Sequence, residues 1–140
     1  MSEPTNEIIQ WVIKGDHDLG TAKITFRHIP EYLDTVIFHC QQATEKYRKA
    51  FLIYQSISFR FSHDLVYLLD LIIQKDSDFN KYYDAVSELQ GYAIEIRYPN
   101  ETIFLSKEIV EKGIKIAKEI REIVTEKMNI SPNYNEIIDK

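Results

Sequence analysis

The chain has 140 residues, 44% of them hydrophobic, which fits one globular domain and excludes wholesale disorder. The formal net charge of −5 argues against non-specific binding to nucleic acid or to an anionic membrane. No apolar run approaches the ~20 residues of a membrane-spanning helix, and the polar amino terminus does not have the basic and apolar regions of a signal peptide. We therefore expect a soluble, cytoplasmic protein with no membrane partner.

The first stretch with helical periodicity starts near Pro4, a residue that is tolerated in a first helical turn. Asp16, His17 and Asp18 look like a set of metal ligands, but neighbouring residues on a helix point about 100° apart and do not converge on one ion. We therefore expect no metal site in this helix. Its buried side is predicted from residues that recur every three or four positions, at Ile8, Val12, Gly15, Leu19, Ala22 and Phe26.

The next helix, expected over residues 31–54, is the one around which the chain is organised. A seam that faces other helices is predicted at Leu33, Val36, Cys40, Ala43, Tyr47, Ala50 and Tyr54. Cys40 is the single cysteine, and its place on this seam predicts a core residue rather than a nucleophile. A second apolar line carries Phe38 and Leu52, with Glu45 midway between them. Because a small bundle does not cover two such faces, we expect a symmetric homodimer with Phe38, Glu45 and Leu52 at its interface.

A loop and a third helix are expected after the central helix. Residues 55–61 alternate between serine and apolar side chains, but no strand partner is apparent elsewhere in the sequence, so a loop is expected. Ser62 is a suitable N-cap for the third helix, with Asp64 in the first turn. A turn at residues 76–78 is expected to end it.

The fourth helix is expected to run from Phe79 to about Arg97, where Pro99 stops it. Asn100 is the expected N-cap of a fifth helix, whose periodicity lapses at Asn129. Helices with short connections and no Gly-rich phosphate loop describe an antiparallel up-and-down bundle.

The fold class predicted from these elements is all-α, an antiparallel up-and-down bundle of four to five helices. We expect one helical domain over residues 1–128 and a C-terminal tail over residues 129–140.

Four sequence motifs occur in an order and at a spacing that resemble the HEPN domain family, named for higher eukaryotes and prokaryotes nucleotide-binding. The resemblance spans most of the chain. The motifs are Trp11 with Asp18 and Leu19, the stretch Phe38-His39-Cys40-Gln41-Gln42-Ala43-Thr44-Glu45-Lys46, His63-Asp64-Leu65, and Arg97-Tyr98-Pro99.

The resemblance implies a helical bundle that is often dimeric and is frequently encoded beside a minimal nucleotidyltransferase. In several branches such pairs behave as toxin and antitoxin, and the helical member is a metal-independent ribonuclease with an arginine and a histidine a few residues apart. This sequence departs from that motif, because no histidine follows Arg97 and Arg60 precedes His63 by only three residues. The catalytic pair of the family is therefore not carried over onto this chain.

Polar residues of the resembling motifs supply the candidate site. For metal-free RNA cleavage, His39 or His63 is the candidate base and Arg97 the candidate phosphate-binding cation. In the structural alternative His63 caps a helix, Glu45 pairs with Arg97 or Arg48, and the glutamines bind backbone groups between helices. The ligand-binding candidates are Glu45, Lys46, Gln42, Arg97 and Tyr98.

Three functions follow as hypotheses. The first is a nucleotide-binding or non-catalytic partner of a minimal nucleotidyltransferase in a pair of toxin–antitoxin type. The second is a metal-independent ribonuclease toxin with a displaced Arg/His pair, and the third is a purely structural dimer module. The expected partners are a second copy of the chain, a nucleotidyltransferase, and a nucleotide or RNA ligand; no metal and no cofactor are expected.

Overall fold

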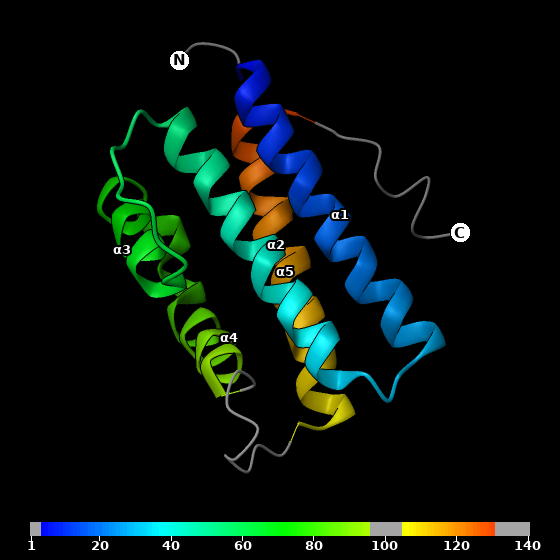
Figure 1. Cartoon of the computed structure of the whole chain (residues 1–140). Helices are drawn as coiled ribbons and strands as arrows, with labels where there is room; N and C mark the ends of the chain where they lie inside the picture. Colours follow the sequence, from blue (N-terminus) through cyan, green and yellow to red (C-terminus); the bar gives the residue numbers. More distant parts are fainter. Residues whose placement is uncertain (1–3, 96–104, 131–140) are drawn as a thin grey trace.

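The structure is a computed structural model that describes residues 4–95 and 105–130, without the side chains of residues 93–95. The described part contains five α-helices, one 3-10 helix and no strand, which confirms the all-α prediction. The helices run up and down beside one another (Figure 1). Their bounds are α1 Asn6–His28, α2 Leu33–Tyr54, α3 Leu65–Lys75, η1 Ser77–Tyr82, α4 Tyr83–Glu95 and α5 Lys107–Met128.

Helix α2 occupies the middle of the bundle, as the sequence predicts. Figure 1 shows it between α1 on one side and α3 and α4 on the other, with α5 behind it, and it contacts all four helices. The short turn of residues 29–32 contains Pro30, and it makes α1 and α2 antiparallel neighbours. Polar side chains on α2 therefore meet neighbouring elements on almost every side.

The predicted seam of α2 is confirmed as the centre of the core. Its middle residues face the fully buried side chains of α1 and α5, and together they belong to one hydrophobic cluster. Complete burial of such a side chain contributes roughly 1.5–3 kcal/mol relative to an exposed one. The fully buried seam residues are Val36, Cys40, Ala43, Tyr47 and Ala50.

The prediction that a second face of α2 stays uncovered is wrong. Leu52 is fully buried within the chain, and Glu45 is only 3% exposed. The start of α3 covers this side, since the Arg48 guanidinium donates to the carbonyl oxygen of Leu65 over 2.9 Å. Of the three interface candidates only Phe38 is exposed, so Leu52 and Glu45 do not form a dimer interface in this fold. A homodimer through another surface stays a prediction.

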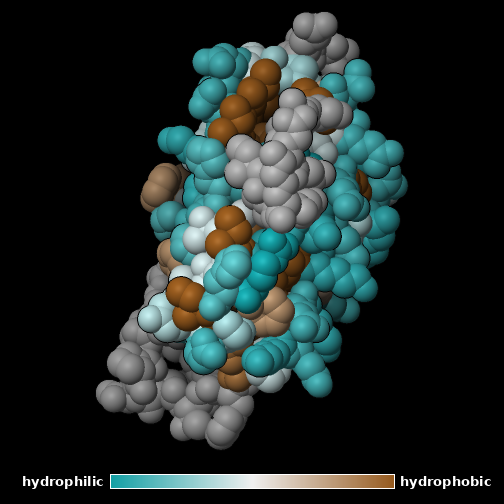
Figure 2. Space-filling view, turned by 90° about the vertical axis from the view of Figure 1, so that its right-hand side faces the viewer, coloured by the Kyte–Doolittle hydropathy of each residue, from teal (hydrophilic) through white to brown (hydrophobic). Residues whose placement is uncertain are grey.

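The visible surface carries its hydrophobic residues in small groups. Figure 2 shows the side that lies at the right in Figure 1, and several separate hydrophobic patches lie there among hydrophilic residues. Over the whole described surface, the exposed large hydrophobic side chains are Ile24, Ile29, Tyr32, Phe38, Phe61 and Tyr83.

The start of α3 differs from the prediction because two short polar side chains compete to cap it. Ser62 Oγ accepts from the backbone N–H of Asp64 over 3.0 Å. The Asp64 carboxylate then accepts from the backbone N–H of Tyr67 over 3.0 Å, so Asp64 is the N-cap. The loop before α3 is confirmed as irregular.

Two later boundaries also move. Ser106, rather than Asn100, caps α5, and its Oγ accepts from the N–H of Ile109 over 3.2 Å. The segment that begins the predicted fourth helix is instead η1, which starts after the Asp76 carboxylate accepts from the N–H of Asp78 over 3.0 Å. Local capping therefore determines boundaries that apolar periodicity does not resolve.

Some predictions fall outside the described residues. These include Arg97, Tyr98 and Pro99, and the part of the predicted tail after residue 130. Helix α5 ends at Met128, where the predicted tail begins. None of the helices in the described ranges combines the length and the apolar character that a membrane span requires.

Two glycines provide a matched test of the α1–α2 packing. A Cβ at Gly15 would lie 2.7 Å from Cε1 of the buried Tyr47 ring, whereas a Cβ at Gly91 on α4 would meet nothing within 4 Å. We expect Gly15→Ala to lower the free energy of unfolding by about 1–3 kcal/mol through overpacking. We expect Gly91→Ala to raise it by about 0.5–1 kcal/mol, because alanine favours a helix. Chemical denaturation measures both values, and a stabilised Gly15→Ala variant would contradict the packing described here.

Candidate functional site

A carboxylate on α1 holds two basic side chains of α2. Nδ1 of His39 donates to Oδ1 of Asp18 over 2.9 Å, and Nζ of Lys46 donates to Oδ2 of the same carboxylate. The three side chains are between 14% and 26% exposed, so they are shielded but remain open to water. Asp18 therefore fixes the position of an imidazole and an ammonium group at the surface.

A second carboxylate repeats this arrangement nearby. Oε1 of Glu45 accepts from Nδ1 of His63 over 2.8 Å, and Oε2 accepts from Nζ of Lys49 over 3.4 Å. Glu45 and Lys49 are each 3% exposed, whereas His63 is 51% exposed. The buried pair holds an imidazole that faces solvent. The predicted pairing of Glu45 with Arg48 is limited to an attraction between their charges, because the hydrogen bonds of Arg48 go to Thr44 and to Leu65.

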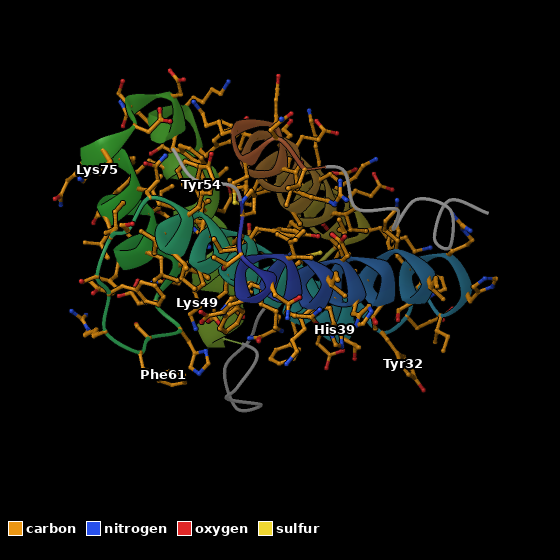
Figure 3. All side chains as sticks on the ribbon, turned by 90° about the horizontal axis from the view of Figure 1, so that it is seen from above. Tyr32, His39, Lys49, Tyr54, Phe61 and Lys75 are labelled. Carbon is orange, nitrogen blue, oxygen red and sulfur yellow. The ribbon has the colours of Figure 1, made fainter. Side chains whose placement is uncertain are left out.

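These two groups are called the polar strip below; it consists of Asp18, His39, Glu45, Lys46, Lys49 and His63, of which Glu45 and Lys49 are nearly buried. Figure 3 shows His39, Lys49 and the neighbouring Phe61 along one side of the bundle. The partly exposed Gln42 lies on the same face of α2, between His39 and Lys46 by helical spacing. The strip runs along the α1–α2 pair and ends at the loop before α3.

Two aromatic rings enclose the ammonium group at the loop end of the strip. Nζ of Lys49 lies 5.5 Å from the centroid of the Trp11 ring and 5.0 Å from that of Phe61. The His63 ring meets Phe61 edge to face, with 5.2 Å between centroids. Cation–π attraction at a partly desolvated site contributes roughly 1–2 kcal/mol per contact, so the rings help to stabilise this nearly buried charge.

The geometry favours the same tautomer for both imidazoles. Because Nδ1 donates to a carboxylate, the proton lies on Nδ1 in the neutral ring and Nε2 faces away from the carboxylate. Such an Nε2 accepts a proton as a base or, once protonated, donates to an anion. The two lysines balance the two carboxylates, so the strip itself does not carry the net negative charge of the chain.

An open groove of about 840 Å³ lies elsewhere, between η1 and α5. It is a poor place for a phosphate because acidic groups dominate its lining: Asp78, Glu119, Glu122 and Glu126. Lys127 in this groove bridges Asp76 and Asp78, with 2.8 Å to each, and these bonds raise the pKa of Lys127. The polar strip is therefore the better candidate for an anionic ligand.

A buried polar network ties three helices together behind the strip. Oδ1 of Asp16 on α1 accepts from the Tyr47 hydroxyl of α2 over 2.6 Å and from Nε of Arg121 on α5 over 2.8 Å. A second bond joins Arg121 to Oδ2 of Asp16 over 3.4 Å. The network fixes the register of α1 against α2 and α5, and thereby the position of Asp18 relative to His39.

The remaining buried polar groups belong to the packed interior of the bundle rather than to the polar strip. Burial raises the pKa of the Cys40 thiol to about 12, so the thiol is protonated and is not a nucleophile at neutral pH. Burial lowers the pKa of Arg48 to about 9, which leaves its guanidinium charged at neutral pH. The prediction that glutamines bind backbone groups between helices is confirmed for Gln90, whose Oε1 accepts from the N–H of Val66. It is wrong for the buried Oε1 of Gln41, which has no hydrogen-bond partner within the described part of the chain.

The structure brings together most of the candidates named from the sequence. His39, His63, Glu45 and Lys46 lie in the polar strip, and Gln42 lies on the same face; Arg97 and Tyr98 are outside the described ranges. His63 does not cap α3, since Asp64 does. The site residues that sequence reasoning missed are Asp18 as a partner for two bases, Lys49, Phe61, and the buried pair Asp16 and Arg121.

One signal in the sequence locates Asp18. It lies ten residues before the end of α1, and Ala43 lies ten residues after the start of α2. Antiparallel helices joined by a short turn bring such positions level with each other. His39 and Lys46 are four residues before and three residues after Ala43, on the same helical face. The spacing therefore predicts that Asp18 lies between these two bases.

A family model of the HEPN domain matches residues 8–128. The chain belongs to the HEPN domain family. Membership indicates a nucleotide-binding or ribonuclease-like role. Five of the six residues of the polar strip, all except Lys49, belong to the motifs on which the family resemblance rests. No curated protein and no solved structure shows a significant match to the chain.

The buried network predicts unequal effects for its members. Arg121→Met leaves the buried Asp16 carboxylate without its guanidinium and is expected to cost about 3–5 kcal/mol of unfolding free energy. Tyr47→Phe removes one hydrogen bond and keeps the ring, so we expect a cost of about 1–2 kcal/mol. Urea denaturation of the two variants measures this difference. Equal, small losses of unfolding free energy in the two variants would show that the buried Asp16 carboxylate does not need the charge of Arg121.

Thiol chemistry tests the burial of Cys40. We expect the native protein not to react with an aromatic disulfide reagent at mildly alkaline pH, because the thiol is buried and its pKa is raised to about 12. The unfolded chain should release one equivalent of the coloured thiolate. Rapid reaction of the native protein would show that the α2 seam is open around this residue.

Proposed function

We propose that this HEPN domain is the nucleotide-binding, non-catalytic partner of a minimal nucleotidyltransferase, in a pair of toxin–antitoxin type. Its polar strip binds the phosphate and sugar of a nucleotide, or one nucleotide of an RNA. The observation that carries the proposal is that family motifs from α1, α2 and the loop before α3 converge on two carboxylate-held imidazoles and two lysines.

Phosphate recognition is the chemistry that this arrangement supports best. Ammonium groups and protonated imidazoles donate charge-assisted hydrogen bonds to phosphate oxygens, and such bonds are stronger than neutral ones. Lys46 and His39 are held in place by Asp18, so binding costs them little side-chain entropy. Because Asp18 and Glu45 stay bonded to these bases, the strip binds a single anion without the broad polyanion affinity that the chain's charge disfavours.

The spacing of the imidazoles supports binding over catalysis. His39 and Glu45, the residue that holds His63, are six positions apart on α2, which corresponds to about 9 Å along the helix axis. In RNA cleavage the base and the acid act on oxygens of one phosphorus atom, so both must converge on that atom. The strip instead spreads its groups along the helix, and no histidine follows Arg97 to restore the family's catalytic pair.

A metal-independent ribonuclease is the second candidate, favoured by one specific observation. A carboxylate bonded to Nδ1 orients each imidazole, and Nε2 is then the ring nitrogen that would contact a substrate, as a general base requires. Arg97 would supply the cation for the phosphorane charge in this account.

Calorimetric titration with AMP, GMP and UMP tests nucleotide binding. We expect Lys46→Ala to weaken the affinity about 10-fold to 150-fold, since a hydrogen bond to a charged group contributes roughly 1.5–3 kcal/mol. Asp18 keeps its bond to His39 in this variant, so the fold should persist. Lys112→Ala, which removes an exposed lysine from α5, is the matched control and should bind as the parent does. Absence of heat for all three nucleotides would contradict the proposal.

Incubation of an RNA pool with the protein in excess chelator separates the two candidates. The proposal predicts intact RNA. Cleavage that is lost in His39→Ala or in His63→Ala would establish the ribonuclease instead. For the partner, we expect a nucleotidyltransferase encoded beside this chain to co-elute with it in size-exclusion chromatography, and separate elution of the two would contradict that part of the proposal.

A further inference from the structure

We propose that Phe61 is the platform on which the base of the bound nucleotide stacks, at the loop end of the polar strip. This inference rests on the proposed function and adds the part of the ligand that the strip recognises beside the phosphate. The starting observation is that Phe61 is 81% exposed, more than any other large hydrophobic side chain in the described part of the chain.

The loop holds Phe61 outward from both sides. On one side, the backbone N–H of Arg60 donates to the Tyr67 hydroxyl over 3.0 Å, and the Arg60 guanidinium lies 3.9 Å from the centroid of the Tyr67 ring. On the other side, Ser62 Oγ accepts from the N–H of Asp64, the residue that caps α3. The backbone around the ring is therefore anchored, and a ligand would not have to order it.

The neighbours of the Phe61 ring cover only a small part of its surface. Nζ of Lys49 approaches the Phe61 ring to 5.0 Å, and the edge-to-face His63 ring supports it from the side. With 81% of the residue exposed, most of the ring surface remains open to solvent. A flat aromatic group covers such a surface well, and stacking of a nucleobase on an aromatic side chain contributes favourably for any base.

The neighbourhood of Phe61 favours a nucleobase over a protein surface. The core of a protein interface is typically a contiguous apolar patch that is depleted of charge. Phe61 instead lies between the exposed Arg60 and the partly buried Ser62, next to the exposed His63. A ligand that combines a flat ring with an anionic group fits an exposed ring beside an exposed imidazole.

The position of Phe61 also matches the rest of the strip. His63 bonds to Glu45 at one point, and Lys46 lies one residue further along α2 and bonds to Asp18. A base on Phe61 would therefore leave its sugar beside His63 and its phosphate toward Lys46. Since every base offers a stacking face, we expect weak preference among bases rather than strict selection of one.

Calorimetric titration of the full chain with AMP and with ribose 5-phosphate tests this inference. We expect the parent to bind AMP more tightly than ribose 5-phosphate. Phe61→Ala should weaken AMP binding about 5-fold to 150-fold, the range measured for loss of one base–aromatic stack, and leave ribose 5-phosphate binding unchanged. Phe61→Tyr should bind AMP as the parent does, and so should Tyr83→Ala, which removes an exposed ring from α4.

The outcomes separate this inference from the proposed function. Equal affinity of the parent for both ligands, or unchanged AMP binding in Phe61→Ala, would overturn the stacking platform while leaving phosphate binding intact. A change of mass in Phe61→Ala by light scattering, with AMP binding unaltered, would also overturn it and assign the ring to a protein contact. No binding of either ligand by the parent would overturn both proposals.

Discussion

The structure depends on how the charged side chains of a central helix are neutralised. Helix α2 is covered by α1, α3, α4 and α5, yet it carries Glu45, Arg48 and Lys49 at positions that are almost completely buried. An uncompensated charge at such a position costs several kcal/mol, so each one needs a partner. The partners come from α2 itself, from the start of α3, and from the loop between them.

The same requirement places two imidazoles at the surface. Glu45 is buried, but it is bonded to His63, half of whose surface is exposed. Asp18 likewise holds His39 and Lys46 at the boundary between core and solvent. The family motifs in the described part of the chain therefore have a structural role, because their carboxylates neutralise lysines of α2 and hold two imidazoles where solvent reaches them.

Periodicity predicted what depends on apolar residues, namely the bundle, the central helix and its buried seam. It wrongly predicted that Leu52 is exposed, because the pattern on one helix does not reveal which neighbouring helix covers each face. Residue type alone does not show that Asp64 and Ser106 are the N-caps rather than Ser62 and Asn100, because all four side chains are suitable for capping. The contact between Asp16 and Arg121 joins positions 105 residues apart, so no local pattern contains it. The position of Asp18 beside His39 and Lys46, by contrast, can be predicted from the sequence, because the short turn between α1 and α2 sets the register of the two helices.

The most direct test of the account is to follow the imidazole protons of all four histidines by NMR during a titration with AMP. His39 and His63 belong to the strip, whereas His17 and His28 are exposed on α1 and serve as internal controls. The account predicts saturable shifts of the His39 and His63 signals with one common affinity, and little change for the other two. Shifts confined to His17 and His28, or no saturable shift at all, would contradict the assignment of the polar strip as the nucleotide site.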